Sequence, residues 1–132
     1  MKELTLCAVG TLLFASGYVI GQRQPPVQNS GFREELLRTL SLENEFATTA
    51  GRTFRMRKIT LQPGGTLALH DHNDRPALTY VLEGRVTYRQ QGKPDQVVTA
   101  GQGMAEGRGT PHWAENTGTV PAVWIGVDIP KQ

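Results

Sequence analysis

The sequence has little cysteine, few aromatic residues and little net charge, and each shortage excludes a class of chemistry. Among 132 residues there is one cysteine, Cys7, and it lies in an apolar N-terminal segment. The rest of the chain therefore forms no disulfide and offers no thiol as nucleophile or metal ligand. The net charge is only +2, and aromatic residues make up 7% of the chain. Because nucleic-acid binding needs a coherent basic face, we expect no nucleic-acid partner.

The N-terminal residues 1–22 have the composition of a targeting segment. An uncharged, mostly apolar run of 17 residues extends from Leu4 to Ile20, behind Met1 and Lys2. This run is longer than the core of a typical signal peptide and just short of a comfortable membrane span. We interpret it either as a cleaved signal peptide or as an uncleaved anchor that contacts the inner membrane. In both cases we expect an exported domain, periplasmic or secreted.

The next segment reads as a connection to the folded domain. Residues 22–31 are rich in proline, glutamine and other polar residues, as in a flexible linker. Residues 32–42 have apolar side chains near helical spacing, with Ser30 as a candidate N-cap. We therefore expect a short helical or irregular segment here, within a linker and N-terminal arm over residues 23–50. Residues 51–132 form the predicted barrel domain. The apolar residues of the arm are Phe32, Leu36, Leu37 and Leu40.

From residue 51 onward, apolar and polar residues alternate with a period of two, which is typical of β-strands. Glycine (15) and proline (8) are frequent in the chain, as expected for strands joined by tight turns. Short strands at spacings of about 8–12 residues predict an all-β sandwich or barrel. The predicted strands cover residues 54–61, 66–72, 78–82, 85–90, 96–99, 103–106 and 122–129.

Three histidines carry the chemistry that the sequence suggests. His70 and His72 are two residues apart on a predicted strand, so both imidazoles leave the same face. Two imidazoles on one face can close on a single metal ion. His112 lies far along the chain, but a barrel brings distant strands together on rigid supports. Surface or hydrogen-bonded core histidines are the alternative interpretation, which an HxH pair with a third histidine disfavours.

The spacing of these residues resembles the two sequence motifs of the cupin family. In the first motif, a glycine precedes a His-x-His pair by five intervening residues, and another glycine closes the motif. In the second, two glycines precede a histidine, and an asparagine follows it. The matching residues are Gly64, His70, His72 and Gly84, then Gly101, Gly109, His112 and Asn116. The resemblance implies a cupin, or jelly-roll, β-barrel with one divalent metal on the three histidines.

The sequence departs from the family pattern at the position of a fourth ligand. The glutamate of the first motif falls on Ala77, which binds no metal, and the proline of the second is replaced by Gly107. Asp74 is the nearest candidate for a fourth ligand, and Thr79 and Asn116 are candidates for supporting positions. The expected inward-facing residues offer no evident general base. The site thus reads as three neutral imidazoles with open positions, which suits Fe, Zn, Mn, Ni or Cu and not Mg or Ca.

Two classes of function are compatible with this site. The first is a metal-dependent oxidoreductase, dioxygenase-like, or a lyase that acts on a small polar or anionic molecule. The resemblance admits it, since some cupins with three histidine ligands are iron dioxygenases. The second is a non-catalytic cupin that binds a small ligand or a metal, and fold alone does not decide between the two. Similar barrels often form homodimers, so a small molecule and a second copy are the expected partners, with Leu37 and Leu40 as candidates to cover the partner's sheet edge.

Overall fold

The computed structural model describes residues 23–109 and 111–131. The predicted targeting segment, residues 1–22, lies outside the described residues. Within the described ranges, no helix is long and apolar enough to cross a membrane. The strands are β1 (Ser30–Ser41), β2 (Thr53–His70), β3 (Ala77–Glu83), β4 (Arg85–Arg89), β5 (Gln96–Thr99), β6 (Gly103–Glu106), β7 (His112–Glu115) and β8 (Ala122–Asp128).

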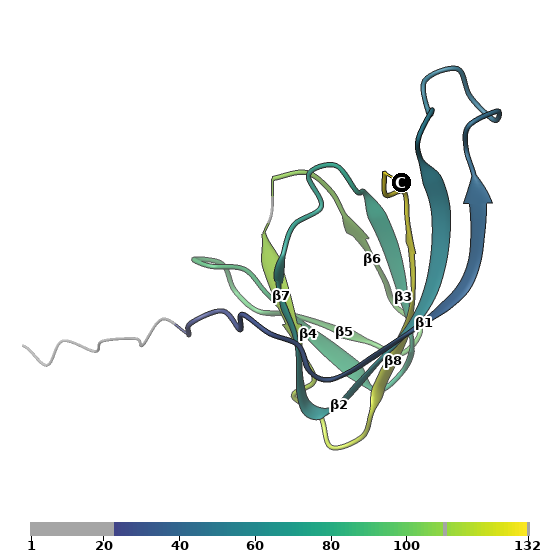
Figure 1. Ribbon diagram of the computed structural model, residues 1–132. Helices are drawn as coiled ribbons and strands as arrows, with labels where there is room; N and C mark the ends of the chain where they lie inside the picture. The colour runs from purple at the N-terminus through teal and green to yellow at the C-terminus, as the bar shows by residue number, and fades with distance from the viewer. Residues whose placement is uncertain (1–22, 110, 132) are drawn as a thin grey trace, which may run out of the picture.

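The strands form one sheet that curls into a nearly closed barrel (Figure 1). Hydrogen-bonded neighbours follow the order β5-β4-β7-β2-β8-β3-β6, and β1 pairs with β2 in addition. The long strand β2 therefore contacts three others, namely β1, β7 and β8. In Figure 1 the end of the β1–β2 hairpin extends beyond the barrel wall. The predicted all-β barrel is confirmed.

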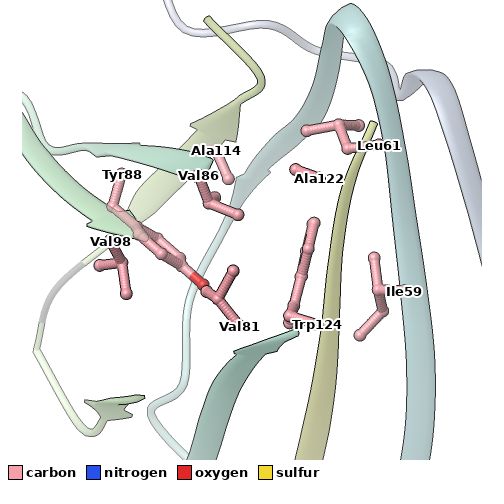
Figure 2. Close-up of a cluster of buried hydrophobic side chains, with 9 residues drawn as sticks. All are labelled: Ile59, Leu61, Val81, Val86, Tyr88, Val98, Ala114, Ala122 and Trp124. Carbon is pink, nitrogen blue, oxygen red and sulfur yellow. The ribbon is translucent and has the colours of Figure 1, made fainter. Parts of the chain in front are cut away.

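The apolar core fills part of the barrel interior. Along β3, Ala77, Thr79 and Val81 are buried, whereas the residues between them are exposed, as the period of two requires. Figure 2 shows Tyr88 of β4 pointing toward Val81 of β3 within this cluster. The buried cluster consists of Ile59, Leu61, Val81, Val86, Tyr88, Val98, Ala114, Ala122 and Trp124. Its members come from β2, β3, β4, β5, β7 and β8, so the same packing holds the strands that carry the histidines.

Gly84 connects β3 to β4 where no larger residue fits. Its φ of 67° lies in the left-handed region, which glycine adopts without steric cost. A Cβ atom at this position would lie 2.5 Å from the carbonyl oxygen of Pro121, the residue before β8. The turn can therefore pack against the start of β8 only because position 84 has no side chain.

The prediction of a short helical or irregular segment at residues 32–42 was wrong. Residues 30–41 form β1, which pairs antiparallel with β2. Phe32, Leu36 and Leu40 are four residues apart, a spacing close to one helical turn. Four is also an even number, so the same spacing fits one face of a regular strand. A bulge at Leu37 shifts the register. The sequence pattern was therefore ambiguous, and the hydrogen bonds offered by β2 decided in favour of a strand.

A buried carboxylate joins three arginines at the end of β8. Asp128 is 1% exposed. It accepts hydrogen bonds from Arg55 (3.0 and 2.8 Å), Arg57 (2.8 Å) and Arg75 (2.6 Å). Burial raises the pKa of Asp128, but the hydrogen bonds from Arg55 and Arg75 and the charge of Arg57 outweigh this effect and lower the pKa. The ionised carboxylate therefore links β2, β8 and the loop before β3.

Asp128→Asn should destabilise the domain strongly. The change leaves three arginines around a neutral group, and breaking a buried ion pair typically costs about 3–5 kcal/mol. Urea unfolding of the full chain, followed by circular dichroism, measures the loss. The matched control is Asp95→Asn, which removes the more exposed partner of Arg89 and should cost at most about 1 kcal/mol. Equal losses in the two variants would contradict the role given to Asp128.

The effect of Asp128→Asn should also depend on pH. The pKa of Asp128 is lower in the folded than in the unfolded chain, so its contribution to the free energy of unfolding is complete above the unfolded value of about 3.9. The contribution declines as the pH falls through the folded value. The difference between wild type and variant should thus be constant near neutrality and shrink in acid. An undiminished difference at about pH 2 would argue against this linkage.

Candidate metal centre

Three histidines from different parts of the chain meet inside the barrel. His70 ends β2, His72 follows it by two residues, and His112 begins β7. The antiparallel pairing of β2 with β7 places His70 directly opposite His112. One ring nitrogen from each histidine lies within 4.8 Å of the other two. The structure therefore brings together the three residues that the sequence predicts as metal ligands.

Backbone carbonyl groups orient two of the rings. His70 Nδ1 lies 2.8 Å from the carbonyl oxygen of Ala68, and His72 Nδ1 lies 2.9 Å from that of Arg75. Because a carbonyl oxygen only accepts hydrogen bonds, each Nδ1 carries a proton and donates it. In the neutral ring, the lone pair is then on Nε2. Metal-ligating histidines usually have this arrangement, since the second ring nitrogen donates to a carbonyl or carboxylate group.

The donor set fits a divalent transition metal. His72 Nε2 is buried and has no hydrogen-bond partner among the described residues. A buried polar atom without a hydrogen-bond partner destabilises the folded state unless a ligand binds to it. Burial lowers the pKa of His70 and His72, which favours the neutral form that binds metals. The three histidines could thus hold an ion such as Zn, Cu, Fe or Ni, all of which accept imidazole ligands.

Glu106 enters the same site from β6. Its Oε2 atom lies 3.2 Å from His72 Nε2, and its Oε1 atom lies 3.5 Å from His112 Nε2. The β3–β6 register places Glu106 directly opposite Ala77. Burial raises the pKa of Glu106, but the hydrogen bond with His112 and the charges of the histidines outweigh burial and lower the pKa. The site therefore contains an ionised carboxylate that is only 9% exposed.

Glu106 was not among the predicted site residues, and its position contradicts the expectation that no general base faces the metal. A signal was present in the sequence. Met104 and Glu106 are two residues apart on a predicted strand and thus share a face. Met104 packs against the core, so Glu106 also faces inward. A charged residue on the inward face of a short strand is costly without partners, which marks it as a candidate for a site.

A cavity of about 290 Å³ is lined by two of the histidines, His70 and His72. This volume is near the lower end of the roughly 300–1,000 Å³ typical of ligand pockets, so it suits a small molecule. Its lining also includes Thr79, Tyr88 and Glu106, together with Arg57 and Arg75. Burial and the Glu106 charge raise the pKa of Tyr88, which keeps its hydroxyl protonated at neutral pH. The cavity thus combines cationic, anionic and neutral polar groups beside the candidate ligands.

The other predicted site residues lie in different places. Thr79 is on the inward face of β3 and lines the cavity. Asp74 lies in the loop before β3, where hydrogen bonds with Lys131 and Arg52 lower its pKa to about 2. Its carboxylate is half-exposed and forms ion pairs with both of these residues. The structure does not bring Asp74 into the histidine cluster.

Asn116 supports the fold around the site. Its Nδ2 group donates hydrogen bonds to the carbonyl oxygens of Leu61 and Val120, both at 2.8 Å. Its Oδ1 atom accepts one from the amide of Gly118 at 2.9 Å. These bonds join the loop after β7 to the middle of β2. Asn116 therefore holds the strand pair that carries two of the histidines and does not itself line the cavity.

Comparison with known proteins identifies the barrel. The sequence profile of the Cupin domain matches residues 57–129, which is more than half of the chain. The comparison with curated proteins gave no match.

Solved structures with a similar fold come from several organisms. A protein from Thermus thermophilus is 27% identical, with a TM-score of 0.54 over 62% of this chain and 76% of that one. A predicted oxalate decarboxylase from Thermotoga maritima is 24% identical, with a TM-score of 0.56 over 82% and 96% of the two chains. An oxalate oxidase in complex with the substrate analogue glycolate is 22% identical, with a TM-score of 0.55 over 76% of this chain and 55% of the longer one.

The profile match and the structure agree. The matched residues contain all three histidines and both glycine-rich motifs, and they fold into the barrel that the similar structures share. The chain therefore belongs to the family of proteins with a Cupin domain.

Proposed function

We propose that this protein binds one divalent transition metal through His70, His72 and His112 and acts on a small anionic molecule as an oxidoreductase or lyase. The observation that carries the proposal is the convergence of three histidine nitrogens within 4.8 Å of one another, beside a cavity that arginines also line. A metal bound there would act as a Lewis acid and offer open positions to a substrate. The groups of the chain itself would bind and orient that substrate.

The charges around the cavity favour an anion. Arg57 and Arg75 line it, and Asp128 binds both side chains. Together with Arg55, these arginines balance the carboxylates of Asp128, Glu34 and Glu106, so a bound divalent metal would give the site an excess of positive charge. The buried Arg57 Nε group also has no hydrogen-bond partner among the described residues. A carboxylate ligand would balance the excess charge and accept the hydrogen bonds that arginine offers.

A non-catalytic function is the alternative. Apart from Glu106, the side chains around the histidines offer few groups that exchange protons near neutral pH: Ala77 is apolar, Thr79 is a neutral hydroxyl, and Tyr88 stays protonated. In this case the barrel would bind a small anion, or the metal alone, without turnover. Metal binding and anion binding are common to both functions, and turnover distinguishes them.

His112→Ala should abolish tight metal binding. Changing a residue that only orients a ligand typically lowers metal affinity roughly 10–100-fold. Removing one of the three ligands themselves should lower it by more. Metal content after reconstitution with Zn(II), Mn(II), Fe(II) or Co(II), with the Kd from chelator competition, measures the effect. The matched control is Asp74→Ala, whose exposed carboxylate lies outside the histidine cluster and should leave the Kd unchanged. Wild-type occupancy in His112→Ala, or no metal in the wild type, would refute the proposed site.

Arg57→Met should weaken the binding of a small carboxylate to the metal-loaded protein. A hydrogen bond to a charged group contributes about 1.5–3 kcal/mol, so we expect roughly a 10- to 100-fold higher Kd for glycolate. Isothermal titration calorimetry measures this value. Arg33→Met removes the same charge from an exposed position of β1 outside the cavity lining and is the matched control. Equal effects of the two substitutions would show that only net charge matters.

Turnover should be found among small carboxylates. The similar structures include a predicted oxalate decarboxylase and an oxalate oxidase with bound glycolate, so dicarboxylates and hydroxy acids are tested first, followed by diketones and thiols. Oxygen uptake by the metal-loaded full chain reports an oxidase, and CO₂ release without net oxygen uptake reports a lyase. Activity above that of His112→Ala supports the enzymatic function. Saturable anion binding without turnover across the panel would favour the non-catalytic alternative.

A further inference from the structure

We propose that Glu106 is a fourth metal ligand, supplied by β6 in place of the glutamate that the family pattern puts at the position of Ala77. This inference rests on the proposed metal-binding function and adds a residue to the same site. Three features of the structure carry it: the register of β3 with β6, the distances between donor atoms, and the burial of the carboxylate.

The register moves the carboxylate from one strand to its neighbour. Glu106 of β6 lies directly opposite Ala77 of β3 in the antiparallel ladder. Side chains at directly opposite positions leave the same face of the sheet, with Cβ atoms about 4.5–5.5 Å apart. Both residues line the same cavity. Because alanine leaves space at position 77, the longer side chain at position 106 can occupy the volume that a glutamate at 77 would fill.

The donor atoms have the separations of a coordination shell. The Glu106 oxygens lie 3.2 and 3.5 Å from the Nε2 atoms of His72 and His112. Ligands bound at about 2.1 Å to one ion lie roughly 3.0–3.4 Å from each other in octahedral or tetrahedral geometry. Glu106 thus has the spacing of a neighbouring ligand to His72 and His112, which form one cluster with His70.

When the His72 ring is neutral, its tautomer places two hydrogen-bond acceptors next to each other. Its Nδ1–H donates to the carbonyl oxygen of Arg75, so the neutral ring has its lone pair on Nε2. That atom and Glu106 Oε2 are both acceptors, 3.2 Å apart, and Nε2 forms no hydrogen bond with a described residue. Two buried acceptors repel each other at this distance unless a positive charge lies between them. A metal ion satisfies both at once.

The fourth ligand would change which metal the site prefers. Three imidazoles leave a bound divalent ion with its full charge, whereas Glu106 compensates one unit of it. A carboxylate oxygen among imidazole ligands moves the preference toward Mn(II) and Fe(II). The departure at Ala77 is therefore a relocation of the carboxylate ligand and not a loss.

The test compares Co(II) binding by full-length wild type and four variants. We expect Glu106→Ala to raise the Kd for Co(II) by more than about 100-fold, beyond the range of residues that only orient a ligand, and Glu106→Gln to raise it less. The double variant Glu106→Ala/Ala77→Glu returns the carboxylate to β3 and should recover most of the affinity. Glu115→Gln is the matched control, because it removes a partly buried carboxylate of β7 that pairs with Arg89 instead of the histidines.

The visible absorption spectrum of bound Co(II) separates a ligand from a positioning residue. We expect the spectrum of metal-loaded Glu106→Gln to differ from that of the wild type, and circular dichroism checks that each variant is folded. Wild-type affinity in Glu106→Ala, or an unchanged spectrum in Glu106→Gln, would overturn the role of Glu106 and leave the three-histidine site intact. Absence of Co(II) binding in the wild type itself would instead overturn the proposed function on which this inference rests.

Discussion

The antiparallel pairing of β2 with its neighbours is the constraint on which the site depends. Its pairing with β7 opposes His70 to His112, and its pairing with β8 brings Arg55 and Arg57 alongside Asp128. One strand thus carries His70 and Arg57 and pairs with the strands that carry His112 and Asp128. A shift of one residue would turn every side chain of β2 to the opposite face, so the register determines the chemistry of the interior.

Two buried carboxylates in this barrel, those of Asp128 and Glu106, have different kinds of neighbours to compensate their charge. Asp128 is surrounded by cations that the chain itself supplies, and its ion pairs connect three segments of the fold. Glu106 faces imidazole rings, two of which are held by backbone carbonyls in the tautomer that presents a lone pair on Nε2. Since a buried charge requires compensation, we interpret the first carboxylate as structural and the second as part of the candidate metal site.

Local patterns predicted much of this arrangement. The period of two in residues 54–129 is a property of the pleated strand itself and needs no tertiary information, which is why most of the strands could be located. The pair of His70 and His72 on one face follows from the same period. Residues 32–42 were ambiguous, because a spacing of four fits both a helical turn and one face of a strand. Only the hydrogen-bonding edge of β2 resolved that ambiguity.

By itself, the sequence determined the fold class and the three histidines, because both follow from periodicity and spacing along the chain. Tertiary structure decided the rest. The register between β3 and β6 set Glu106 opposite Ala77, and the loop before β3 directed Asp74 toward Arg52 and Lys131 and away from the histidines. Pairing between strands is a relation between distant segments, with no trace in the local pattern of either one. The local pattern could mark Glu106 as a charged residue on an inward face, but only the pairing of the strands placed its carboxylate beside the histidines.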